Sequence, residues 1–137
     1  AVETAEVRGL LMVSPSCGPP SHRENVFSPG EWTELMERGE TLRKSVRVRR
    51  SFLEAMETEE IYAVARRVTV PAVVFHGAAD EYFDDANVSR LLAVLPGARR
   101  IEIPGGDHNY LRPGARDVFL AAFAAVLETP ADFLSRS

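Results

Sequence analysis

An acidic side chain and an imidazole each follow a short apolar segment of this sequence. Asp80 comes just after the segment 71–77. His108 comes just after the segment 99–103 and a glycine-rich turn. In parallel α/β sheets the carboxyl ends of neighbouring strands meet at one edge, and side chains there can be aimed at a ligand. We therefore expect Asp80 to orient His108, and such a pair is two thirds of a nucleophilic triad.

Three apolar segments predict the strands that position this pair. Segment 71–77 is rich in β-branched residues, too short for a helix and closed by a glycine, which predicts a strand buried on both faces. Segment 99–103 predicts the next strand. Segment 7–15 ends at a proline and predicts a further strand, also buried on both faces of a parallel sheet.

Residues 16–66 form an excursion between the first two of these strands. Loop residues lead to Ser28, which is expected to cap a helix that ends at Gly39. The basic segment 41–50 fits either an extended chain or the start of a helix. Residues 51–67 predict a helix with an interrupted apolar face, formed by Phe52, Leu53, Met56, Ile61, Val64 and Ala65.

Two more helices alternate with the strands in the rest of the chain. Residues 84–95 begin with acidic side chains, which the helix dipole favours, and stop at a Pro-Gly pair. Residues 118–127 are strongly apolar and must pack against the sheet, whereas the tail 130–137 is short and peripheral. This alternation predicts an α/β fold, with a parallel sheet, right-handed crossovers and helices on both faces.

The composition fits one compact domain and excludes several partners. The chain has 137 residues, of which 45% are hydrophobic and 26% charged. A net charge of -4 leaves no basic face for phosphates, so neither nucleic acid nor an anionic membrane surface is an expected partner. No apolar run is long enough to span a bilayer, and no signal peptide opens the sequence. These features predict a cytoplasmic protein.

The remaining cysteine and histidines carry little chemistry. Cys17 is the only cysteine, which excludes an internal disulfide and zinc sites built on cysteine pairs. A metal site from His76, Asp80 and His108 would lack a ligand-spacing signature, so we expect no metal and no other cofactor. His76 is expected to pack at a strand end, and His22 lies in a polar loop.

Three short sequence motifs, in this order along the chain, resemble those of a known family. Residues 70–81 read VPAVVFHGAADE, residues 95–100 read LPGARR and residues 103–108 read IPGGDH. Together they resemble the C-terminal half of an α/β-hydrolase of the serine esterase, peptidase and dienelactone hydrolase type. The resemblance implies that residues 1–137 are the C-terminal part of such a domain, with residues 16–66 as a cap-like insertion.

The resemblance also implies roles for individual residues. Asp80 would be the triad acid and His108 the general base. Asp84 and Asp85 are alternative acids, although a position at the start of a helix already accounts for them. Four further residues flank the two positions and either line a substrate pocket or anchor loops: Tyr82, Phe83, Asn109 and Tyr110.

The sequence departs from the family at the nucleophile. No G-x-S-x-G motif is present, and the nearest segment, 26–30, has a valine in place of the first glycine. The nucleophile and the oxyanion donors would therefore lie outside this chain. With them, the expected activity is hydrolysis of a small-molecule carboxylic ester, thioester or amide through an acyl-enzyme.

Two alternatives to a hydrolase remain open. The chain could be a non-catalytic scaffold or binding module that keeps the hydrolase fold, since it lacks the nucleophile. A flavodoxin-like nucleotide-binding domain would need a Gly-rich phosphate loop, but prolines occupy that place in residues 14–19. In either case the first strand would have an open edge, which an N-terminal hydrolase half or a second copy of the chain could cover.

Overall fold

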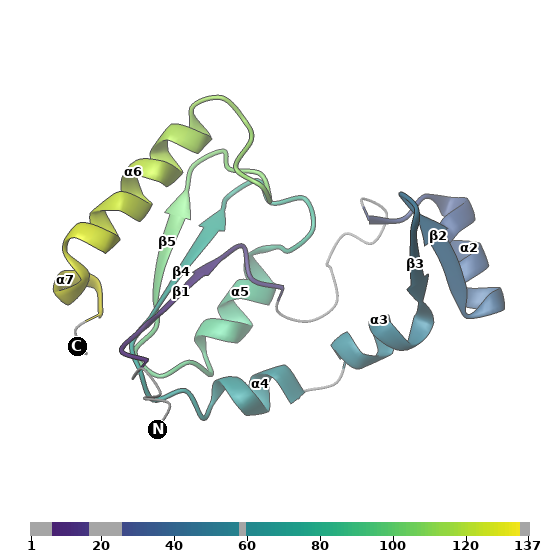
Figure 1. The fold of residues 1–137 in the computed structure, drawn as a ribbon, viewed down its shortest axis with the longest axis horizontal. Helices are drawn as coiled ribbons and strands as arrows, with labels where there is room; N and C mark the ends of the chain where they lie inside the picture. Colours follow the sequence, from purple (N-terminus) through teal and green to yellow (C-terminus); the bar gives the residue numbers. More distant parts are fainter. Residues whose placement is uncertain (1–6, 17–25, 58–59, 135–137) are drawn as a thin grey trace, which may run out of the picture.

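The computed structural model describes residues 7–16, 26–57 and 60–134. Cys17 and His22 therefore lie outside the described residues. The elements in chain order are β1 (Leu10–Val13), α2 (Pro29–Arg38), β2 (Glu40–Arg43), β3 (Val46–Arg49), α3 (Arg50–Glu57), α4 (Glu60–Ala65), β4 (Ala72–Gly77), α5 (Asp85–Leu92), β5 (Arg99–Ile103), α6 (Ala115–Glu128) and α7 (Pro130–Leu134) (Figure 1).

The main sheet has three parallel strands in the order β1-β4-β5. Leu11 pairs with Val73, and Phe75 pairs with Ile101. Every residue of the central strand β4 is buried, as its apolar, glycine-terminated sequence predicted. The three carboxyl ends consequently lie at one edge of the sheet (Figure 1).

Strand β1 corrects one prediction. It is paired in parallel as expected, but its side chains are only partly buried, and Val13 is 43% exposed. The prediction of burial on both faces was wrong because β1 is an edge strand, with β4 as its only partner among the described residues. Its other edge is open, as the sequence indicated.

Helices cover both faces of the sheet, which confirms the α/β fold. On the face of Val74, α4 and α5 contribute Tyr62, Ala65, Val88 and Leu91 to a core cluster, which Leu95, just after α5, completes. On the opposite face, α6 packs Phe119 and Phe123 against Phe75, with ring centroids 5.6 and 5.5 Å apart. No helix in the described part of the chain is long and apolar enough to cross a membrane.

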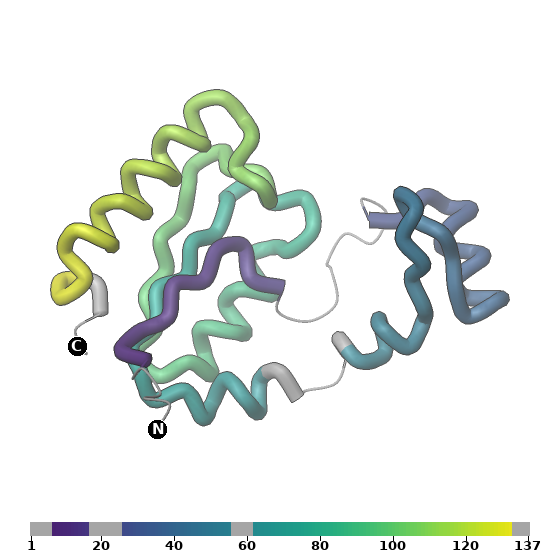
Figure 2. Tube along the Cα trace, in the orientation of Figure 1, coloured from purple at the N-terminus to yellow at the C-terminus, as the bar shows by residue number. Residues whose placement is uncertain are grey.

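The excursion between β1 and β4 builds a small core of its own beside the sheet (Figure 2). Ser28 caps α2 in a complete capping box, and Gly39 ends the helix with a φ of 79°, as predicted. The basic segment then forms the antiparallel hairpin β2–β3, and α3 starts at Arg50. The extended alternative is therefore the observed one, with a turn in which Lys44 and Ser45 have positive φ.

The predicted helix over residues 51–67 is two helices. Leu53 on α3 joins the core of the excursion, whereas Ala65 on α4 joins the core of the sheet. Phe52 and Val64 are more than half exposed, so the single apolar face was wrong. The predicted apolar face is not continuous because α3 and α4 pack into two different cores. The Met56 and Ile61 side chains lie outside the described residues.

Candidate active site

Glycines bring the ends of β4 and β5 into close contact. A Cβ on Gly77 would lie 2.3 Å from the carbonyl oxygen of Gly106, a distance that no side chain tolerates. The backbone N–H of Ala79 donates to the same carbonyl at 2.9 Å. The loop after β4 is thereby fastened to the turn that precedes His108.

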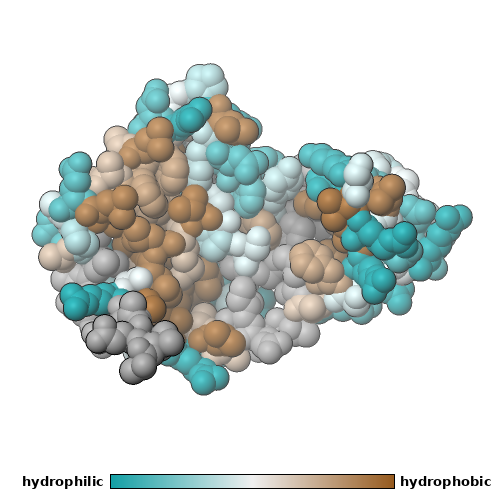
Figure 3. All heavy atoms as spheres, viewed as in Figure 1, coloured by the Kyte–Doolittle hydropathy of each residue, from teal (hydrophilic) through white to brown (hydrophobic). Residues whose placement is uncertain are grey.

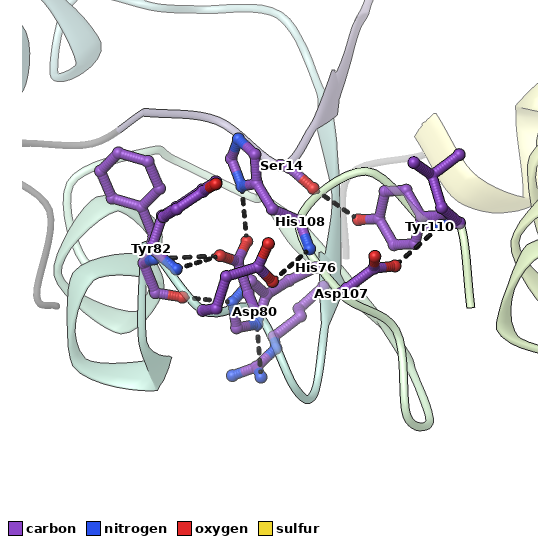
Figure 4. A network of polar contacts seen from close by, with 11 residues as sticks. Ser14, His76, Asp80, Tyr82, Asp107, His108 and Tyr110 are labelled. Atoms are coloured by element: carbon purple, nitrogen blue, oxygen red, sulfur yellow. Dashed lines mark hydrogen bonds and ion pairs between the residues drawn. The ribbon is translucent and has the colours of Figure 1, made fainter. Parts of the chain in front are cut away.

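Asp80 is buried and held by three hydrogen bonds. Its side chain is 1% exposed. Oδ1 accepts from the backbone N–H groups of Tyr82 and Phe83 at 2.9 and 3.0 Å, and Oδ2 lies 2.9 Å from Nδ1 of His108 (Figure 4). The structure therefore places the two residues that the sequence proposed as acid and base in direct contact.

The imidazole of His108 is oriented from several sides. Its backbone N–H donates to Oε2 of Glu81 at 3.1 Å, and its ring lies 5.0 Å from that of Tyr82 and 5.6 Å from that of Phe83. An ionised Asp80 only accepts hydrogen bonds, so Nδ1 carries the proton and Nε2 keeps a free lone pair. Nε2 has no hydrogen-bond partner among the described residues, and the side chain is 21% exposed.

A compact turn fixes the loop after His108. Oδ1 of Asp107 accepts from the backbone N–H groups of Leu111 at 2.8 Å and Arg112 at 3.4 Å. Tyr110 has a φ of 53° and donates its N–H to the carbonyl of Asp107. These bonds satisfy the backbone of a tight loop and limit movement of the imidazole.

Tyr110 lies in the core of the sheet and is 4% exposed. Its ring stacks on Phe119 at 4.3 Å, and its hydroxyl accepts from Oγ of Ser14 at 3.0 Å (Figure 4). Burial raises the pKa of the Tyr110 phenol, and the negative charge of Asp80 raises it further. The fourth flanking residue, Asn109, is exposed and does not line the cavity described below.

His76 is packed at the end of its strand, as the sequence indicated. Its Nε2 lies 3.1 Å from the carbonyl oxygen of Phe83, and its Nδ1 lies 3.1 Å from Nη2 of Arg100. Arg100 also bonds Asp85, and this hydrogen bond together with the guanidinium charge lowers the pKa of the Asp85 carboxyl. Both ring nitrogens of His76 thus have partners away from His108, and the residue is 3% exposed.

Asp84 and Asp85 have the helix-start roles expected of them. Asp84 is the N-cap of α5, and its side chain accepts from the N–H of Asn87 at 3.0 Å. Asp85 pairs with Arg100. Neither bonds His108 among the contacts of the described residues, which leaves Asp80 as the acid in contact with the imidazole.

A cavity of about 240 Å³ lies between the excursion and the loop after β4, which carries Asp80. Its lining residues are Ser16, Val26, Phe27, Arg43, Lys44, Phe52, Leu53, Tyr82 and Phe83. Tyr82 and Phe83 were proposed from their proximity to Asp80. The others come from the excursion, and only its position beside the loop after β4 brings them here. Among the described residues, no group of three potential metal ligands is present.

No family model matches the chain. An L-allo-isoleucyltransferase from Pseudomonas savastanoi pv. glycinea is 24% identical over 99 residues, which cover 72% of this chain and 35% of that protein. The esterase Est1E from Butyrivibrio proteoclasticus, solved with ferulic acid bound, superposes with a TM-score of 0.63 at 18% identity. An esterase domain of a Rhodothermus marinus protein gives a TM-score of 0.59 at 17% identity.

The matches cover nearly all of this chain but only about half of each matched structure. The Est1E match covers 91% of this chain but 51% of Est1E, and the second match covers 93% and 52%. The chain has the fold of the C-terminal part of an α/β-hydrolase. It spans about half the length of these hydrolase structures and about a third of the transferase.

Proposed function

We propose that this chain supplies the acid and the base of a serine-hydrolase-type acyl hydrolase. The observation that carries the proposal is the buried Asp80 carboxylate 2.9 Å from Nδ1 of His108, with Nε2 unoccupied among the described residues. A carboxylate in this position fixes the imidazole tautomer and stabilises the imidazolium that forms when Nε2 takes a proton.

The reaction would run in two acyl-transfer steps. Nε2 of His108 removes the proton from a serine hydroxyl as its oxygen attacks the acyl carbonyl of an ester, thioester or amide. The imidazolium then returns this proton to the departing alcohol, thiol or amine, leaving an acyl-enzyme. Water repeats the sequence, and the carboxylic acid leaves. Asp80 stays ionised throughout.

The serine in this proposal lies outside residues 1–137. The chain contains no G-x-S-x-G, and the hydroxyl of Ser14, which stands at the end of β1, bonds Tyr110 and not His108. The proposal requires an N-terminal hydrolase half, either joined to this chain or separate. This requirement is supported by the fact that the chain covers only about half of each esterase structure.

The surface beside β1 fits such a half. Apolar side chains gather over α6 and the neighbouring part of the sheet in Figure 3. Val13 on β1 and three side chains of α6, namely Val118, Leu120 and Leu127, are each at least 43% exposed. Together with the open edge of β1, they offer both unpaired backbone groups and apolar area to a neighbouring strand and helix.

Residues 16–66 would act as the cap of this enzyme. The described part of this excursion contributes Phe27, Arg43, Phe52 and Leu53 to the cavity beside His108. A wall built from an insertion can vary without changing the sheet, so it would select the small-molecule acyl substrate. Tyr82 and Phe83 would form the part of the pocket nearest the imidazole.

Two other functions have some support. Acyl transfer to an acceptor other than water would use the same acid and base, and the similarity to a transferase favours it. A non-catalytic scaffold is favoured by the missing nucleophile. A scaffold gives no reason for an oriented Asp80–His108 pair, however, and this is why we prefer catalysis.

The test is complementation. The chain is combined with an N-terminal hydrolase segment that carries G-x-S-x-G, and hydrolysis of nitrophenyl esters is followed with and without an amine acceptor. Hydrolysis should appear on mixing and fall at least a hundredfold in His108→Ala, while His76→Gln, matched in residue type, keeps it. Activity that survives His108→Ala would rule out the assignment. Formation of amide in preference to acid would favour transfer.

A further inference from the structure

The cavity beside His108 has apolar walls and two cationic side chains. Its aromatic wall, Tyr82 and Phe83, is in ring contact with His108. Arg43 and Lys44, from the end of β2 and the following turn, also line it. A substrate that places its acyl carbon at His108 and extends into this cavity would therefore meet positive charge.

These two cations differ from the other basic side chains of the hairpin. Arg47 and Arg49 both pair with Glu40, and Arg50, which follows the hairpin at the start of α3, pairs with Glu54 at 3.1 Å. Arg43 and Lys44 form no ion pair with any described residue. Among the described residues, the neighbouring cations are therefore ion-paired, whereas the two at the cavity are not.

Arg43 is also fixed in place without an ion pair to a described residue. Its Nε donates to the carbonyl of Val26, and its guanidinium lies over the ring of Phe27 at 5.8 Å from the centroid. The terminal nitrogens remain available for a planar anion. The nearby carboxyl of Glu31 is held by hydrogen bonds from Ser28, and the charges of Arg43 and Lys44 contribute to its lowered pKa.

We infer that Arg43 and Lys44 bind an anionic group of the substrate, a carboxylate or a phosphate, at the end of an apolar portion that fills the cavity. This inference rests on the proposed function for the position of the reacting acyl group. An apolar body with a charged end matches a site whose walls are hydrophobic and whose few polar groups fix orientation. The substrate class is thus an ester, thioester or amide that carries a second, negatively charged group.

Binding to the chain itself tests the inference without turnover. The probes are phenylbutyrate, phenylpropyl phosphate and the neutral phenylbutyramide, titrated by calorimetry and by the fluorescence of Trp32. Trp32 is the only tryptophan, and its ring lies 5.8 Å from that of Phe27 in the cavity wall. We expect each anion to bind about tenfold more tightly than the amide, as for a charge-assisted hydrogen bond. The two anions together show whether carboxylate or phosphate is preferred.

Variants locate the source of the preference. Lys44→Gln, at an exposed turn, should reduce the preference about threefold without affecting the fold, and Arg43→Gln should reduce it further. Arg47→Gln is the matched control on the same hairpin, because its guanidinium is paired with Glu40 and does not line this cavity. Its preference should be unchanged.

Three results would overturn the inference. The first is equal binding of phenylbutyrate and phenylbutyramide, and the second is that no probe binds saturably. The third is a preference for anions over the amide that disappears in His108→Gln but persists in Lys44→Gln. The last result would mean that the anion binds the imidazole. If no hydrolysis appears in the complementation assay but the chain still binds anions preferentially, the proposed function would be refuted and the anion site would stand.

Discussion

Nδ1 of His108 lies 2.9 Å from Oδ2 of Asp80, although the two residues are 28 positions apart in the sequence. Two parallel strands make this contact possible, because β4 and β5 end at the same edge of the sheet. The carboxylate also accepts hydrogen bonds from the backbone N–H groups of Tyr82 and Phe83. The pair is therefore held as a unit and is not a chance surface contact.

Asp80→Asn should leave the fold intact and reduce kcat of the complemented enzyme roughly a thousandfold. An amide in this position no longer selects the tautomer with a free Nε2 and does not stabilise the imidazolium. Asp84→Asn is the matched control, because asparagine also caps a helix, and its kcat should change less than about twofold. Equal losses in the two variants would contradict the assignment of Asp80 as the acid.

Gly77→Ala should destabilise the chain by about 2–3 kcal/mol. The added methyl group would meet the carbonyl of Gly106 at 2.3 Å, so the turn before His108 must shift. Gly30→Ala, in α2, has open space around the new Cβ and should raise stability slightly. Denaturant unfolding of both variants measures the difference. A Gly77→Ala variant as stable as the parent would disprove the close contact.

The Tyr110 phenol should titrate above its usual pKa near 10. Burial raises this pKa in the folded state, so the associated stability is complete below pH about 10 and is lost as pH rises through the native value. Tyr110→Phe should remove this alkaline loss and, without the bond from Ser14, cost about 1 kcal/mol at neutral pH. The difference in tyrosinate absorbance between parent and variant isolates Tyr110 from Tyr62 and Tyr82. A midpoint at or below 10 would refute burial.

Amide exchange should reveal the open edge of β1. The N–H groups of Leu10 and Ser14 donate to the carbonyls of Pro71 and Phe75, so by strand alternation those of Leu11 and Val13 face away from β4. In the chain alone Leu11 and Val13 should exchange quickly and Leu10 and Ser14 slowly. Addition of an N-terminal hydrolase half should protect the first two. Unchanged exchange of Leu11 and Val13 in an active complex would exclude docking at this edge.

The sequence predicted the elements whose signals are local. The capping box at Ser28, the stop at Gly39 and the buried strand β4 depend on neighbouring residues, and all three are found. The Asp80–His108 contact was predictable because parallel topology converts two strand ends into one site. The resemblance of three short sequence motifs to those of α/β-hydrolases also pointed to Asp80 and His108.

Features set by tertiary packing were not predictable in the same way. Strand β1 has a core-like sequence but lies at an edge of the described sheet. The position of Tyr110 beside His108 in the sequence fitted either a pocket residue or a loop anchor, and only the structure shows that it has a positive φ and lies in the core. The cavity cations Arg43 and Lys44 lie in a hairpin whose turn has no glycine, so neither the turn nor its position beside the site was visible.

The most direct test of the central claim is labelling of the complemented enzyme with a fluorophosphonate, followed by peptide mass spectrometry. We predict one labelled serine, located outside residues 1–137, with a labelling rate that falls at least a hundredfold in His108→Ala. Label on Ser14 or another serine of this chain, or a rate that does not depend on His108, would contradict it.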